Sequence, residues 1–204
     1  MRKATSSLII LIRHGQTTSN ARGLLVGRSD PALTELGERQ ARALRPLLSG
    51  VSEVWSSPLR RARSTAKLAF PDVAHIVRDS FIEVDYGDLD GSPMSSVTVA
   101  QWESFETDHS LAIGNGESLD SVDGRVHAEL DQLLADRDSL LYDNQRHLAI
   151  VSHVSPIKSA LAWALGVPGS VAWRTRLDNG SITTIGTRRT SPTLVHFNVV
   201  PPLA

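Results

Sequence analysis

The pattern of apolar and polar positions predicts strands and helices that alternate along the chain. Residues 8–12 form a short apolar run rich in isoleucine, which is typical of a strand buried on both faces of a parallel sheet. Residues 148–151 repeat this pattern. Further strands are predicted at residues 51–55, 76–78 and 193–199. We therefore expect one α/β domain over residues 1–204, a three-layer α/β/α sandwich with a mostly parallel central sheet.

Capping signals place helices between these strands. Thr34 is a predicted N-cap with acidic residues in the turn that follows, and Gly50 is placed to end that helix. Ser57-Pro58 and Ser155-Pro156 each combine an N-cap serine with proline at the first helical position. Gly166 is expected to end the second of these helices.

The middle of the chain has weaker signals. Residues 117–137 carry an apolar stripe at helical spacing and predict a long helix. Asn179-Gly180 predicts a turn between residues 171–177 and 181–186. Residues 79–116 lack a clean period, so we expect them to form an insertion that acts as a lid over the carboxyl edge of the sheet.

Composition excludes several classes of function. The chain has 204 residues, no cysteine and a formal net charge of −1. Thiolate chemistry is excluded, and no overall field favours nucleic acid or anionic membranes. No segment approaches the roughly 20 apolar residues of a membrane span. We expect a cytoplasmic protein with a small-molecule partner and neither nucleic-acid nor membrane partners; a homodimer through the terminal strands stays open.

Three strand-to-helix junctions present polar groups at one edge of the predicted sheet. The first strand ends in Arg13-His14, the second leads to Ser57 and Arg61, and a third ends in Ser152-His153. Ligands of open α/β sheets sit outside the carboxyl ends of the strands. The three junctions therefore predict one site for an anion at this edge.

The second junction carries cations where a helix dipole disfavours them. Arg60, Arg61 and Arg63 lie in the first predicted turns, where acids would be more stable by a few tenths of a kcal/mol up to ~1 each. A bound phosphate reverses that preference, because free N–H groups and guanidinium groups then act on one anion. For Arg60 or Arg63 alone we favour a solvated side chain; for Arg61 we favour the anion site.

The two histidines at these junctions suggest phosphoryl transfer. A lone histidine at a strand end is more often structural, but His14 and His153 are accompanied by Arg13 and Arg61. A neutral imidazole can attack phosphorus and form a phosphohistidine. Two arginines and a protonated His153 would stabilise the charge on the phosphoryl oxygens without a metal.

A proton donor is expected in the acidic segment that follows the third strand. Asp85, Asp88 and Asp90 surround Glu83 in the sequence, and like charges with partial burial would raise its pKa, as a general acid requires. From spacing alone, a solvated acidic loop is the better interpretation.

In combination, these motifs resemble the histidine phosphatase superfamily, in the branch that contains cofactor-dependent phosphoglycerate mutases. The R-H-G-[EQ]-T signature appears at residues 13–17, S-x-L-x-R-A at 57–62, and the second histidine in Val151-Ser152-His153. Glu83 with residues 87–91 resembles the E-x-x-x-G-x-x-E-G element, and Gly116-Glu117-Ser118 with Arg125 resembles a helix start of the family.

The resemblance implies a phosphoglycerate mutase-like fold and a role for each matching residue. His14 would be the nucleophile, and Glu83 would protonate the leaving oxygen. The implied phosphoryl-binding residues are Arg13, Arg61 and His153. The implied pocket residues are Asn20, Gln16 and Thr17. Val154 stands where the family usually has glycine, which adds a side chain beside the pocket and could tilt a backbone amide.

Three functions remain open at this point, and a metal-independent phosphomonoesterase is favoured. Mutases of the family carry a longer, basic segment after the catalytic glutamate, whereas residues 92–120 contain no lysine or arginine. A phosphoglycerate mutase is the alternative, and a non-catalytic phospho-ligand binder is the second alternative. Trp102, Phe105 and Leu111 form either an apolar lid or ordinary core packing.

No cofactor or metal site is expected. The remaining histidines have no ligand-like spacing in the sequence; they are His75, His109, His127, His147 and His196.

Overall fold

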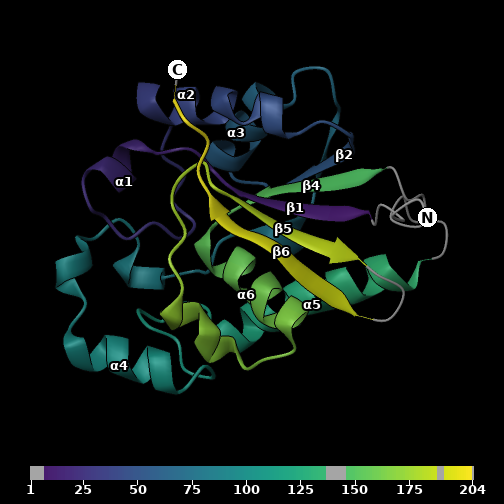
Figure 1. The fold of residues 1–204 in the computed structure, drawn as a ribbon. Coiled ribbons are helices and arrows are strands. Elements are labelled where there is room, and N and C mark those ends of the chain that lie inside the picture. Colours follow the sequence, from purple (N-terminus) through teal and green to yellow (C-terminus); the bar gives the residue numbers. More distant parts are fainter. Residues whose placement is uncertain (1–6, 137–145, 188–190, 204) are drawn as a thin grey trace.

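The computed structural model describes residues 7–136, 146–187 and 191–203, which contain one sheet in the order β3-β2-β4-β1-β5-β6 (Figure 1). The pairs β1–β4, β4–β2 and β2–β3 are parallel, whereas β5 is antiparallel to β1 and β6 is antiparallel to β5. The predicted, mostly parallel sheet is confirmed. The strands are β1 (Leu8–Arg13), β2 (Val51–Ser56), β3 (His75–Val77), β4 (His147–Ser152), β5 (Ile182–Thr187) and β6 (Pro192–Val199).

Helices cover both faces of the sheet, as the apolar run in β1 predicts. Ile9 and Leu11 join the core cluster beneath α5 and α6, whereas Ile10 and Ile12 join the cluster beneath α2 and α3 (Figure 1). Successive strand residues face opposite sides, so both sides of this strand are buried. The helices are α1 (Thr18–Ala21), α2 (Glu35–Ala43), α3 (Arg60–Ala69), α4 (Val99–Thr107), α5 (Leu119–Ala135) and α6 (Val154–Leu165).

The predicted starts of α3 and α6 are each wrong by two residues, in opposite directions. The N-cap of α3 is Leu59 and that of α6 is His153, rather than Ser57 and Ser155. The reason is that carboxylates distant in sequence satisfy the first amides of both helices. Asp30 accepts from the amides of α3, and a glutamate described below does the same for α6.

Two other boundaries follow from local chemistry. Thr34 caps α2 as predicted, but α2 ends at Ala43 and a 3-10 turn follows, because Pro46 cannot continue the helix. Gly166 ends α6 in the left-handed conformation, as expected.

The predicted turn at Asn179-Gly180 is present, but residues 171–177 do not form a strand before it. The 3-10 helix η6 (Gly169–Arg174) occupies most of that segment, and the turn leads from it into β5. The Gly180 N–H donates to the carbonyl oxygens of Arg13 and His14 at 3.1 and 3.2 Å. The turn therefore packs on the end of β1 rather than closing a hairpin.

Residues 79–116 contain short helical turns and α4, in line with the lack of a clean period. The 3-10 turns are η2 (Asp79–Phe81), η3 (Gly87–Leu89) and η4 (Met94–Ser96). In Figure 1 α4 lies apart from the sheet, towards the end of the molecule where β1 leads into α1. Among the helices in the described part of the chain, none is long and apolar enough to cross a membrane.

Candidate active site

His14 follows β1, and one backbone carbonyl orients its ring. Nδ1 lies 2.7 Å from the Gly15 carbonyl oxygen. A carbonyl oxygen only accepts, so in the neutral ring Nδ1 carries the proton and Nε2 keeps its lone pair. The side chain is buried, and burial together with Arg61 and Arg13 lowers the pKa of His14 well below its usual value. His14 therefore has the protonation state that a nucleophile needs.

The turn after His14 packs closely against α2, which requires glycine at one position in each. A Cβ atom at Gly15 would lie 2.2 Å from the Gly37 carbonyl oxygen, and one at Gly37 would lie 2.0 Å from that of Gln16. The Gly15 N–H also donates to Thr65 Oγ1 in α3 at 3.0 Å. These contacts bring α2 and α3 against the end of β1.

Arg61 lies in the first turn of α3 and points inward. Its side chain is fully buried, with Nε 3.3 Å from His14 Nε2. Its terminal nitrogens donate to the carbonyl oxygens of Ser29 and Gly27 at 2.6 and 2.8 Å. Arg60 and Arg63 are exposed on the same helix. The guanidinium of Arg61 is thus fixed beside Nε2 of His14.

Arg13 and His153 complete the group at this edge. Arg13 donates to the Leu177 carbonyl at 2.5 Å, and its Nε is buried without a hydrogen-bond partner among the described residues. His153 Nδ1 is also buried and unpaired, while its Nε2 lies 2.7 Å from Ser57 Oγ. The two imidazole rings lie 5.1 Å apart between centroids. The unpaired Nε–H of Arg13 is available to donate to an incoming anion.

The structure favours a neutral His153 while no anion is bound, and a protonated His153 beside a phosphoryl group stays a prediction. Burial, followed by the charges of Arg61, His14 and Arg13, lowers the pKa of His153 well below its usual value. A buried imidazole between cations is neutral until an anion arrives.

Glu83 is buried, and the first amides of α6 hold its carboxylate. Oε2 accepts from the Val154 N–H and Oε1 from the Ser155 N–H, both at 3.1 Å, and Oε1 also accepts from the Val84 N–H at 2.9 Å. The Val154 amide is therefore aimed at Glu83, and the effect of the valine on the tilt of this amide stays a prediction. Its side chain lines the cavity described below.

The predicted crowding of Glu83 by other acids is wrong. The neighbouring carboxylates bind elsewhere: Asp85 accepts from the Gly87 N–H, Asp88 from Asn115, and Asp90 from the amides of Gly27 and Ser29. Backbone amides of turns, which sequence spacing does not show, attract these side chains.

A half-buried ion-pair network braces the Glu83 backbone. Glu117 accepts from Arg125 at 2.9 Å and from Arg28 at 3.0 Å, and Arg28 Nε donates to the Glu83 carbonyl at 2.8 Å. Burial raises the pKa of Glu117, but hydrogen bonds and charge from the two arginines outweigh this and lower it.

Of the three predicted pocket residues after His14, only Asn20 lines the cavity. Asn20 Oδ1 accepts from Thr17 in a capping box at the start of α1, which leaves the amide NH₂ group free to donate. The placement of Gln16 and Thr17 on the pocket wall is wrong. Gln16 accepts from Thr34 Oγ1 and Thr17 caps α1, so both side chains are used within the loop.

A cavity of about 270 Å³ opens beside Arg13, His14 and Glu83. Trp102 and Phe105 lie on its wall, and Phe105 is also part of the core. Leu111 is exposed and does not line the cavity, so its proposed place in a lid is wrong. The other lining residues come from five segments: Asn20, Leu24, Leu25, Val26, Tyr86, Met94, His109, Leu119, Val122, Asp123, Val154, Ser155, Lys158, Ser159, Gly169, Ala172 and Trp173.

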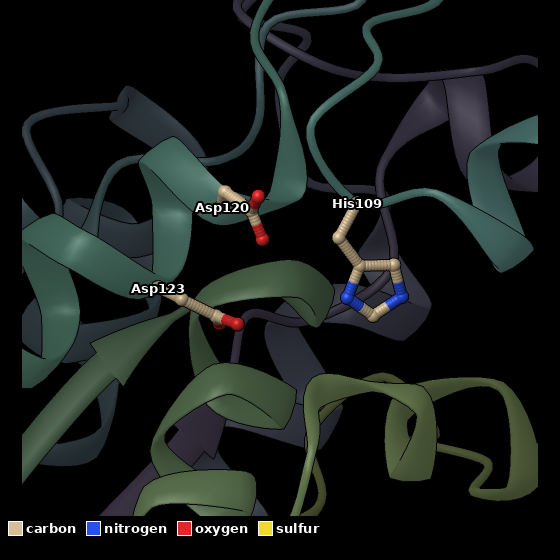
Figure 2. A group of neighbouring side chains, drawn as sticks. All are labelled: His109, Asp120 and Asp123. Carbon is tan, nitrogen blue, oxygen red and sulfur yellow. The ribbon is translucent and has the colours of Figure 1, made fainter.

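One group with metal-ligand geometry exists among the described residues. Potential ligand atoms of His109, Asp120 and Asp123 lie within 4.8 Å of one another (Figure 2). His109 comes from the loop after α4 and the two aspartates from the start of α5, so their sequence spacing gave no sign of it. The absence of a bound metal stays a prediction.

The family follows from comparison with known proteins. A model of the histidine phosphatase superfamily (branch 1) matches residues 9–200. The chain belongs to this superfamily.

Relatives of this histidine phosphatase have several recorded activities. The chain is 32% identical to the bifunctional protein Rv2228c of Mycobacterium tuberculosis over 88% of its length, but spans about half of that relative. It is 30% identical to phosphoserine phosphatase 1 of Hydrogenobacter thermophilus, covering 94% of this chain and 92% of that one. The structure of the alpha-ribazole phosphatase from Shigella flexneri superposes with a TM-score of 0.81 at 28% identity, over 94% and 96% of the two chains.

Sequence reasoning missed several residues on the cavity wall of this histidine phosphatase. Lys158 lies one helical turn beyond Val154, a spacing that could have revealed it. Its Nζ donates to the Ala172 carbonyl at 2.6 Å, and burial with the charge of Arg13 lowers its pKa. Trp173 and Tyr86 carried no signal, because they come from η6 and a loop without periodicity.

Proposed function

We propose that this protein is a metal-independent phosphomonoesterase that acts through a phosphohistidine on His14 and hydrolyses a small phosphorylated metabolite. The observation that carries the proposal is the orientation of His14. Its Nδ1–H is bound to the Gly15 carbonyl, and its Nε2 lone pair faces Arg61. The ring can therefore attack phosphorus without a general base to deprotonate it, and the fixed cation of Arg61 lies beside it.

The reaction proceeds in two steps. The Nε2 lone pair attacks phosphorus as the phosphorus–oxygen bond to the leaving group breaks, and Glu83, which enters this step protonated, transfers its proton to the leaving oxygen. A water molecule then gives a proton back to Glu83 and attacks the phosphohistidine, which releases phosphate and free His14. Arg13, Arg61 and Asn20 donate to the phosphoryl oxygens. The phosphoryl dianion raises the pKa of His153, which can then donate as well.

The distribution of charge in the cavity favours hydrolysis over a mutase reaction. Among the residues that line it, Arg13 and Lys158 are the only lysines or arginines, and Lys158 already binds the Ala172 carbonyl. A bisphosphorylated intermediate needs a second cationic site, which these residues do not supply. A protein that only binds phosphorylated ligands would not need both a neutral His14 and a Glu83 held by backbone amides.

The test is hydrolysis of p-nitrophenyl phosphate in EDTA by the wild type, His14→Ala and His196→Ala. His196 is exposed on β6 and serves as the matched control. We expect activity in the wild type and the control, and none in His14→Ala. Brief incubation with labelled substrate followed by alkaline quench should trap acid-labile phosphate on the wild type only.

Other results would favour the alternatives. Fast bisphosphate-dependent interconversion of 3- and 2-phosphoglycerate with slow hydrolysis would support the mutase. Binding of phosphorylated ligands without turnover of any of them would support the non-catalytic binder.

A further inference from the structure

The cavity wall beyond the phosphate groups is aromatic. Trp102, Phe105 and Trp173 contact one another edge to face or tilted, with ring centroids 5.8 to 6.4 Å apart. Tyr86 packs against Phe105 at 6.5 Å. Such rings prefer another aromatic group as a partner, and they attract a cation over their faces. A small carboxylic acid would leave this surface without a complementary ligand.

The cavity also has an acidic end. Asp123 lines it together with His109 (Figure 2). A Cβ atom at Gly169 would lie 2.9 Å from His109 Nδ1 and 3.0 Å from Asp123 Oδ2, so the absence of a side chain there leaves room beside both groups. His109 Nε2 is buried without a partner among the described residues. Among the described residues, the one ion-pair partner available to Asp123 within 4.0 Å is His127, at 3.9 Å, whose Nε2 already lies 3.2 Å from the Ser159 carbonyl.

This acidic end is remote from the reacting phosphorus. Glu83 is held at the amides of Val154 and Ser155, in the first turn of α6. Ser159, the contact of the neighbouring His127, lies about 6 Å further along the same helix axis. The leaving group would therefore extend from Glu83 past the aromatic rings towards Asp123.

We infer that the substrate is a phosphomonoester whose leaving group is an aromatic ring system with a cationic or hydrogen-bond-donating group at its far end. The inference rests on the proposed phosphatase activity and assigns the specificity to this wall. A cavity of about 270 Å³ has the size for such a small molecule rather than for a folded protein segment. Lys158 does not reverse the preference, because its ammonium group is directed to the Ala172 carbonyl.

The test compares substrates that differ only at the far end. O-phosphotyramine carries an ammonium group, and the phosphate ester of 3-(4-hydroxyphenyl)propionate carries a carboxylate on a similar phenol. Phosphoserine and 3-phosphoglycerate represent small acids, and all assays contain EDTA so that a metal at the acidic cluster cannot contribute. We expect kcat/KM for O-phosphotyramine to exceed that for the carboxylate ester by at least about tenfold. Both aromatic esters should exceed the small acids.

Asp123→Asn and Asp120→Asn form a matched pair in the first turns of α5. Asp123 lines the cavity, whereas Asp120 is exposed and does not. Asp123→Asn should reduce the preference for the ammonium ester to about threefold or less, and Asp120→Asn should retain it. Equal loss in both variants, or no loss in Asp123→Asn, would overturn the assignment of the acidic end. Faster turnover of the carboxylate ester, or of the small acids, would overturn the substrate class.

Binding separates this inference from the proposed function. Calorimetric titration of His14→Ala with the two aromatic esters reports the preference without turnover. If the wild type hydrolyses nothing but His14→Ala binds the ammonium ester more tightly, the proposed function fails and the assignment of the wall stands. If the wild type is an active phosphatase and neither assay shows a preference, the assignment of the wall fails alone.

Discussion

Replacing Arg61 with glutamine removes the cation beside His14 and should reduce both stability and activity. In the wild type the guanidinium donates to two backbone carbonyl oxygens, at 2.6 and 2.8 Å, and faces His14 Nε2 at 3.3 Å. A buried acceptor without a donor costs about 1–3 kcal/mol, and the glutamine amide can satisfy one of the two. We therefore expect the free energy of unfolding to fall by about 1–3 kcal/mol.

The substitution should also reduce kcat by more than the loss of folded protein accounts for. A donor aimed at the charge that develops in the transition state contributes about 10²–10³ in kcat when it is removed alone. Urea unfolding followed by circular dichroism gives the stability, and kcat/KM is measured at a temperature where both proteins are folded. The expected loss is at least a hundredfold.

Arg63→Gln provides the control, because it makes the same change on an exposed position of the same helix. It should alter the free energy of unfolding by less than about 0.5 kcal/mol and leave kcat/KM within twofold. A folded Arg61→Gln protein that keeps kcat/KM within about threefold of the wild type would refute the role of this arginine at the phosphoryl group.

Two further predictions concern stability. The pKa values of His14 and His153 are lowered on folding, so the unfolded state binds more protons than the folded state below about pH 6.5. The free energy of unfolding should therefore fall as the pH drops from 7 to 5, by up to about 1.4 kcal/mol per pH unit for each ring. Urea midpoints at several pH values measure this, and a flat profile would contradict the neutral, buried state of both rings. Glu117→Gln weakens the network behind Glu83 and should lower the free energy of unfolding by about 1–3 kcal/mol and reduce kcat. The control is Glu38→Gln, which removes an exposed ion pair with Arg42 and should lower the free energy of unfolding by less than about 1 kcal/mol. An equal effect of the two changes in thermal melts and activity assays would disprove the bracing role of Glu117.

The starts of α3 and α6 show a limit of prediction from local sequence. Ser57 and Ser155 have the right residue type to cap α3 and α6, yet neither does so. Asp30 and Glu83 satisfy these amides instead, from positions about 30 and 70 residues earlier in the chain. Helix-capping propensity describes how a residue behaves beside its sequence neighbours. It contains no information on a carboxylate from a distant loop that binds the same amides.

The acidic loop shows the same limit from the opposite side. Its four carboxylates looked like a cluster that raises the pKa of Glu83, but turn amides and asparagine bind three of them separately. The placement of Gln16 and Thr17 fails for a related reason, because their side chains stabilise the loop that carries them.

The sequence by itself determined the layered α/β fold and the junctions that carry His14, Arg61 and His153. It could do so because a strand buried on both faces must be apolar at every position, and the polar residues that end such strands converge at one edge. Only the tertiary structure decided which nitrogen of His14 is free, how Glu83 is held, and which side chains of residues 79–116 and η6 line the cavity. These depend on contacts between segments far apart in the chain, whose geometry has no period or spacing in the sequence.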